Sequence, residues 1–196
     1  MNADPNVPIA AFTEYASAHY WVASHLMQLF GVLLMSAALL LLLRRLFDGP
    51  GAEFALLATA GVIVGLAAAA ALQAVDGIAL KVIVDRWAAA PAAARPLYFQ
   101  AAFAVRQIEI GLASMTSLLF GLAVSMYGGA LCRDALYPRW FAGLSFAGGI
   151  PTAIAGVVMA FTGFSNLAMA INLPAGLLLI LLMFVLGVYG WRHSIF

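Results

Sequence analysis

Charged residues divide the chain into long apolar stretches. None occurs in Leu26–Leu43, Phe54–Val75 or Ile110–Cys132, and none occurs in Trp140–Trp191, which is long enough to cross a bilayer twice. A helix needs about 20 apolar residues to cross roughly 30 Å of hydrocarbon. The pattern therefore predicts an all-α integral membrane protein, built as a single bundle of five transmembrane helices.

Turn signals and prolines indicate where these helices end. The turn at 48–51 ends the first helix, and the apolar pattern of the second continues past the membrane edge to Trp87. The third helix begins early, after Arg95, and Asn172 with Pro174 favours the start of the fifth. We therefore expect the second and third helices to extend beyond the outer membrane face. The predicted helices cover 20–45, 54–87, 97–131, 140–162 and 173–191 of a single domain, 1–196.

The composition agrees with a membrane protein. A hydrophobic fraction of 65% and a charged fraction of 9% lie far outside the range of soluble globular proteins. A net charge of +1 argues against a nucleic-acid partner, since phosphate binding needs a concentrated basic face. The partners that we expect are the lipid bilayer, a small-molecule or lipid ligand, and either a second copy of the chain or a partner membrane subunit.

The basic residues near the helix ends indicate an orientation. Five arginines fall at three junctions on one side of the membrane, and the positive-inside rule makes that side cytoplasmic. The amino terminus then lies outside and the carboxyl terminus inside, in a bacterial inner membrane. The five are Arg44, Arg45, Arg133, Arg139 and Arg192, against four basic residues on the other side, Lys81, Arg86, Arg95 and Arg106.

Polar residues gather near the outer boundary of the predicted bundle. Counting about 1.5 Å per residue from the cytoplasmic ends places them roughly 27 to 37 Å up four of the five helices. At this level three pairs are three residues apart, so the members of each pair share a helix face. The pairs are His25 with Gln28, Gln73 with Asp76, and Arg106 with Glu109.

These polar faces allow a structural and a functional interpretation. A buried charge at this depth needs a partner, so we expect Arg106 to pair with Asp76 or Glu109 and to clamp the long helices together. The functional interpretation is an outward-facing pocket for a small or lipid-like ligand, in which Arg106 holds an anion and His25 carries a proton. The candidate ligand-binding residues are Trp21, His25, Gln28, Gln73, Asp76, Arg106, Glu109 and Asn172.

Two further functions compete with ligand binding. A membrane-embedded acid–base enzyme would use the same pocket, with His25, Asp76 and Glu109 as candidate catalytic residues. An accessory or structural subunit of a larger membrane complex would instead use the glycine-rich fourth helix as an interface.

The histidines bear on metal and haem binding. A metal could recruit His19 and His25, but six residues of separation put them on different faces of a continuous helix. A haem held between helices needs axial ligands that face each other, whereas the third histidine, His193, falls at the opposite membrane face. The pattern therefore favours neither cofactor.

Overall fold

The computed structural model describes residue 4 and residues 7–192, and every regular element in that part of the chain is a helix. Five helical segments are long and apolar enough to cross a bilayer: Trp21–Leu46, Ala52–Ala89, Arg95–Arg133, Arg139–Thr162 and Asn166–Arg192. The prediction of an all-helical chain with five helices long and apolar enough to cross a bilayer is confirmed for the residues described. The elements are α1 (Pro8–Ser17), α2 (Trp21–Leu46), α3 (Ala52–Leu72), η1 (Gln73–Leu80), α4 (Lys81–Ala89), α5 (Arg95–Arg133), α6 (Arg139–Thr162) and α7 (Asn166–Arg192).

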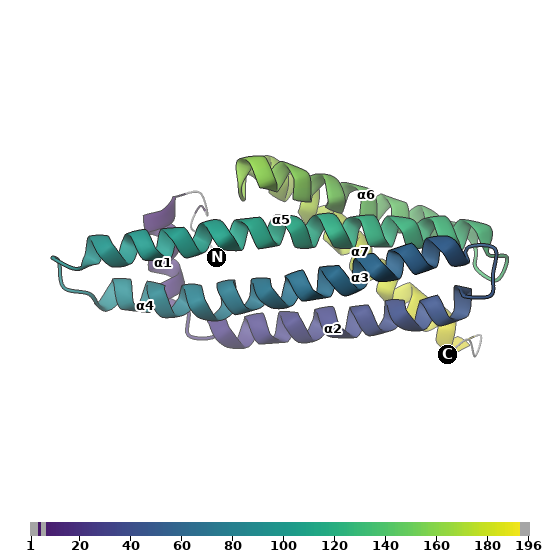
Figure 1. Ribbon diagram of the computed structural model, residues 1–196, viewed down its shortest axis with the longest axis horizontal. Coiled ribbons are helices and arrows are strands. Elements are labelled where there is room, and N and C mark those ends of the chain that lie inside the picture. The colour runs from purple at the N-terminus through teal and green to yellow at the C-terminus, as the bar shows by residue number, and fades with distance from the viewer. Residues whose placement is uncertain (1–3, 5–6, 193–196) are drawn as a thin grey trace.

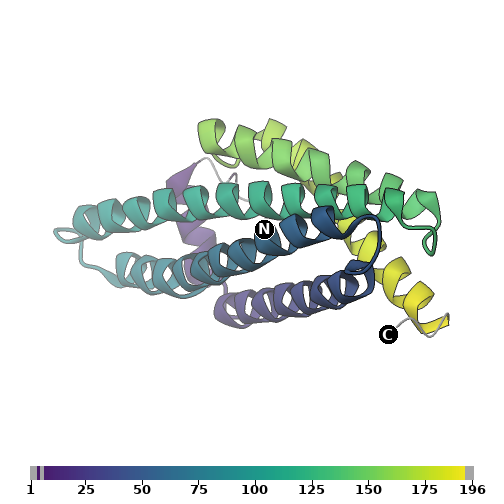
Figure 2. The ribbon, with the colours of Figure 1, turned by 45° about the vertical axis from the view of Figure 1, so that its right-hand side comes forward.

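The long helices pack in the order α2, α3, α5, α6, α7. The central helix α5 contacts α3 on one side and α6 on the other, while α2 packs on α3 and α7 packs on α6. In Figures 1 and 2, α7 crosses the other helices obliquely and ends near the carboxyl-terminal end of α2. The two outer helices of the series, α2 and α7, face each other across a groove and make few close backbone contacts.

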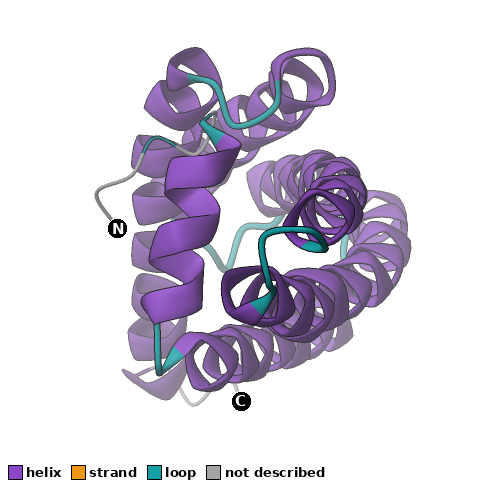
Figure 3. Ribbon diagram, turned by 90° about the vertical axis from the view of Figure 1, so that its left-hand side faces the viewer, coloured by secondary structure: helices purple, strands orange, loops and turns teal. Residues whose placement is uncertain are grey.

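The two ends of the molecule differ in construction. The α2–α3 and α5–α6 connections lie at one end, where the junction arginines are (Figure 1). At the other end, η1 and α4 continue the line of α3 and run beside α5 to the α4–α5 loop. The short helix α1 lies across this end (Figures 1 and 3) and buries Phe12 and Tyr15 against it.

Several helix boundaries differ from the sequence-based prediction. The start of the fifth helix at residue 173 is wrong, because α7 begins at Asn166 and contains Pro174 within it. The turn before α7 is short: Gly163 ends α6 with a φ of 63°, and the Ser165 hydroxyl accepts a hydrogen bond from the Ala168 N–H at 3.2 Å. These local signals, rather than Asn172 and Pro174, set the boundary.

The interface between α5 and α6 depends on glycine. A Cβ placed on Gly121 would lie 2.3 Å from the backbone nitrogen of Ala153, and one on Gly156 would lie 2.6 Å from the backbone nitrogen of Leu118. The Ser114 hydroxyl also donates a hydrogen bond to the Gly156 carbonyl at 2.8 Å. Small residues of this kind let membrane helices approach at backbone distance.

Candidate functional site

Two contacts between polar side chains connect α2 to η1, one helical turn apart along α2. His25 Nε2 lies 3.0 Å from Asp76 Oδ2, and Gln73 Nε2 donates to Gln28 Oε1 over 3.4 Å. His25 and Gln73 are buried, and the Asp76 side chain is 19% exposed. The spacing of three residues within each element thus aligns both polar pairs, as the sequence pattern predicts.

The local backbone of η1 allows the contact between Asp76 and His25. The segment Gln73–Leu80 is a π-helix within an otherwise α-helical run, a form that often marks functional positions. Gly77 follows Asp76 directly, and a Cβ on Gly77 would lie 2.6 Å from the Cβ of His25. A glycine is therefore required there for η1 to reach the histidine.

The hydrogen bonds of His25 define its protonation. Its Nδ1 lies 2.7 Å from the carbonyl oxygen of Trp21, which can only accept, so Nδ1 carries a proton. The 3.0 Å contact between His25 Nε2 and Asp76 Oδ2 then holds one further proton between the two side chains. The pair is neutral overall, whether that proton resides on His25 or on Asp76.

A second charged pair lies within α5. Arg106 Nη1 donates to both carboxylate oxygens of Glu109, at 3.2 and 3.0 Å, and both side chains are about 95% buried. The guanidinium also lies over the rings of Tyr15, at 5.4 Å, and Phe164, at 5.2 Å. The Arg106 guanidinium therefore contacts residues of three segments: α1, α5 and the turn between α6 and α7.

Of the two partners predicted for Arg106, the structure shows Glu109. The structure pairs Arg106 with Glu109, three residues along the same helix, whereas Asp76 pairs with His25 of α2. The Arg106–Glu109 pair does not itself clamp the second and third predicted helices together, because both of its members belong to α5. An i,i+3 partner needs no second helix to be positioned, which makes it the nearer choice for the guanidinium.

Aromatic rings of α1 and α2 enclose the histidine. Trp21 stacks on His25 with ring centroids 4.6 Å apart, and Tyr15 packs on Trp21 at 4.4 Å. The Trp21 indole N–H donates to the Asp76 carbonyl at 3.0 Å. Burial raises the pKa of the Tyr15 phenol above its ordinary value, and the nearby Arg106 guanidinium opposes part of that rise.

Two buried oxygens of η1 have no hydrogen-bond partner among the described residues. They are Oε1 of Gln73 and Oδ1 of Asp76. An unpaired buried polar atom is costly, and native structures rarely leave one without a reason. Both belong to the residues that make the contacts with α2, so the site has unused hydrogen-bonding capacity.

A groove opens beside this cluster, between α2 and α7. It has a volume of about 840 Å³, and its polar end is formed by Gln28, Gln73 and Asn172. The remainder is apolar. It is lined by Gly31, Val32, Leu34, Met35 and Ala38 of α2 and by Gly176, Leu179, Ile180 and Met183 of α7.

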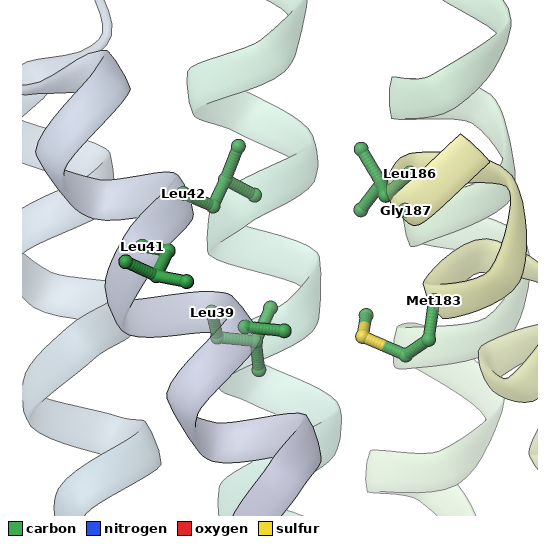
Figure 4. Close-up of a pocket in the computed structure, with 7 residues that line it drawn as sticks. Leu39, Leu41, Leu42, Met183, Leu186 and Gly187 are labelled. Carbon is green, nitrogen blue, oxygen red and sulfur yellow. The ribbon is translucent and has the colours of Figure 1, made fainter. Parts of the chain in front are cut away.

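A smaller apolar pocket of about 280 Å³ continues the groove toward the arginine-bearing end. It shares Ala38 and Met183 with the groove. Figure 4 shows leucines of α2 and Met183 and Leu186 of α7 extending toward each other across this space. The two cavities therefore lie next to each other between α2 and α7, with polar side chains at one end and apolar side chains along the rest.

The predicted site residues thus separate into three sets. Gln28, Gln73 and Asn172 line the groove, as given above. The second set, Trp21, His25 and Asp76, lies one turn beyond the groove, and Arg106 and Glu109 form a separate buried pair.

Sequence reasoning missed Tyr15, Phe164 and Gly77. The apolar spacing of Ala11, Phe12 and Tyr15 after Pro8 is a helix signal that could have identified α1. No group of three or more histidine, cysteine or carboxylate side chains able to hold a metal occurs among the residues described, and His193 lies outside them.

No protein-family model matches this chain, and neither a curated protein nor a solved structure shows significant similarity to it.

Proposed function

We propose that this integral membrane protein binds an amphipathic, lipid-like molecule in the groove between α2 and α7. The observation that carries the proposal is the buried Gln73 side chain, whose Oε1 has no partner among the described residues, at the polar end of an apolar groove of about 840 Å³. A ligand site of this size with a few convergent polar groups is typical of small-molecule binding proteins.

The combined length of the two cavities favours a molecule with an extended apolar chain. From Asn172 to Gly187 of α7, a rise of 1.5 Å per residue gives about 22 Å, or roughly three quarters of the hydrocarbon thickness. Both walls are helices that the membrane surrounds, so a lipid-like molecule can enter laterally. Its polar end would lie at the level of Gln73 and its apolar end near Leu186.

The proposal places the protein in a bacterial inner membrane with its amino terminus outside. The junction arginines, Arg44, Arg45, Arg133, Arg139 and Arg192, support this orientation through the positive-inside rule. In this orientation the polar end of the groove faces outward. The helices α4 and α5 would then extend past the outer membrane face, with α1 lying across them.

A second candidate function is acid–base catalysis at the same end. It is favoured by the 3.0 Å contact of His25 with Asp76, which holds a shared proton, and by the free Asp76 Oδ1. His25 is held in one orientation by the Trp21 carbonyl, as a catalytic histidine would need to be. The polar head of a substrate bound in the groove would have to pass the Gln73 side chain to reach His25 and Asp76.

Native mass spectrometry of the full chain from mild detergent tests the binding proposal. We expect a bound molecule of lipid-like mass on the wild-type protein and none on Gly176→Leu, whose new side chain fills open space in the groove. Gly143→Leu is the matched control, because Gly143 of α6 also has no neighbour within 4 Å but lies outside the groove.

Two results would contradict the proposal. One is a bare monomer for the wild-type protein. The other is an adduct that survives in Gly176→Leu, which would place the molecule elsewhere. Co-purification of a stoichiometric partner subunit in place of a small molecule would favour the accessory-subunit alternative.

A further inference from the structure

We infer that the polar head of the molecule in the α2–α7 groove is uncharged and both donates and accepts hydrogen bonds, as a hydroxyl or carboxamide head does. This inference rests on the proposed function, because it names the class of molecule that the groove binds. It follows from the side chains that line the polar end of the groove, which are all carboxamides: Gln28, Gln73 and Asn172.

The three carboxamides reach the groove from both of its walls. Gln28 belongs to α2 and Gln73 to η1, whereas Asn172 belongs to α7. The other residues that line the groove are glycine, alanine, valine, leucine, isoleucine and methionine. A polar head at this end therefore meets amide groups on both sides and apolar side chains elsewhere.

These amides keep most of their hydrogen-bonding capacity for a ligand. The Asn172 side chain is half-buried and makes no hydrogen bond with any residue described. Gln73 Nε2 and Gln28 Oε1 make a long contact with each other, at 3.4 Å. Each carboxamide has an oxygen that accepts and a nitrogen that donates, so the set offers both functions whichever way each amide is turned. A head with a hydroxyl or an amide group can use both.

A charged head finds no opposite charge among the residues that line the groove. A charge in apolar surroundings is costly unless an opposite charge compensates for it. Arg106, which the sequence suggested as an anion anchor, does not line the groove, and its guanidinium is bonded to both oxygens of Glu109. His25 and Asp76 also lie outside the lining and pair with each other. The carboxamides therefore favour a neutral head over a phosphate, a carboxylate or an ammonium group.

A second cavity of the same chain provides an internal reference. This reference cavity has a volume of about 410 Å³, lies between α5 and α6, and is lined by apolar side chains and Ser125. The Ser125 hydroxyl donates its proton to the Gly121 carbonyl at 2.8 Å. A lipid chain can lie in the reference cavity, but no side chain there offers a donor to its head.

Photoreactive amphiphiles with one chain and three heads test this inference. The probes share a diazirine-bearing hexadecyl chain and carry a glycerol ether, a sulfonate or a trimethylammonium head, so one is neutral and two stay charged at every working pH. Each is added at equal concentration to the full-length protein in lipid nanodiscs, and labelled peptides are mapped by mass spectrometry.

Labelling of the groove walls is divided by labelling of the reference cavity, which corrects for differences in how the probes partition into the membrane. This ratio should be about tenfold higher for the neutral probe than for either charged probe, the effect expected of two hydrogen bonds.

Asn172→Leu provides the matched variant, because leucine branches at the same carbon as asparagine but carries no polar group. The advantage of the neutral probe should then fall to less than about threefold. Gly176→Leu should abolish labelling of the groove walls by all three probes and leave labelling of the reference cavity unchanged. The comparison of the three heads on wild-type protein stands even if Asn172→Leu does not fold.

The outcomes separate the inference about the head from the binding proposal. Equal ratios for the three probes, or a higher ratio for a charged one, would overturn the inference about the head while leaving the binding proposal intact. An unchanged advantage of the neutral probe in folded Asn172→Leu would also overturn it. Absence of groove labelling by every probe, or labelling that Gly176→Leu leaves unchanged, would overturn the binding proposal itself.

Discussion

Glycine closes one helix interface of this protein and leaves another open. In the interface between α5 and α6, a Cβ on Gly121 would lie 2.3 Å from a backbone atom of the neighbouring helix. In the groove between α2 and α7, a Cβ on Gly31 or Gly176 would meet nothing within 4 Å. The same residue type therefore brings two backbones into contact in one place and widens a cavity in the other.

The difference shows how packing works in an apolar solvent. Lipid tails are as apolar as leucine side chains, so membrane helices gain little from burying apolar surface against each other. They associate where small residues permit close van der Waals contact, as α5 and α6 do. If the proposed lipid-like molecule fills the groove between α2 and α7, the groove need not collapse, because filling it costs little.

The largest expected difference in stability comes from adding one methyl group to a glycine of the α5–α6 interface and to a glycine of the α2–α7 groove. Gly121→Ala should reduce the free energy of unfolding by more than about 3 kcal/mol, because the atoms that its Cβ would meet are all backbone. Gly176→Ala should change it by less than about 0.5 kcal/mol. Reversible unfolding by SDS titration, followed by circular dichroism, measures both. Similar losses in the two variants would contradict the comparison.

The second largest effect is expected at the buried ion pair of Arg106 and Glu109, beside Tyr15 of α1. Arg106→Gln should cost about 3 kcal/mol, because it leaves the buried Glu109 carboxylate without its main partner. The double variant Arg106→Gln/Glu109→Gln should cost less than the single one, which the same SDS titration can measure. A double variant less stable than Arg106→Gln would show that the pair is not what holds this end.

A third, smaller effect is expected at the junction of α2 and η1. Gly77→Ala should cost about 1 to 2 kcal/mol, since its Cβ would overlap His25 Cβ and push η1 away from α2. Gly31→Ala, on α2 itself, is the control and should be nearly neutral. The ring protons of His25 in solution NMR would report the loss of its contact with Asp76. An unshifted His25 signal in Gly77→Ala would refute the close-contact geometry.

The apolar pattern was enough to predict the five long helices, but not the grooves between them. Charge-free runs such as Leu26–Leu43 carry the helix signal directly, and the spacing of Gln73 and Asp76 indicated their shared face. The π-helical turn could not be foreseen, because it follows from how η1 meets α2 rather than from local residue preferences. Whether Gly121 or Gly176 faces a backbone or a cavity depends in the same way on the partner helix.

The smallest expected effect concerns α1 and alkaline pH. Burial raises the pKa of Tyr15 above its ordinary value of 10.0, so the unfolded chain loses this proton first as the pH rises. Stability should therefore fall above about pH 10, with a slope of at most about 1.4 kcal/mol per pH unit from this group. Tyr15→Phe should show a shallower loss in melting temperature between pH 9 and pH 11. Identical profiles would contradict a buried phenol at this position.

An experimental structure in a lipid nanodisc tests the central claim most directly. The account expects elongated density between Gly31 of α2 and Gly176 of α7, with its polar end within hydrogen-bond distance of Gln73. It also expects backbone contact between Gly121 and Ala153 in the same map. A structure in which α7 packs directly against α2 and leaves no groove, or in which a helix of a second copy occupies it, would contradict the account.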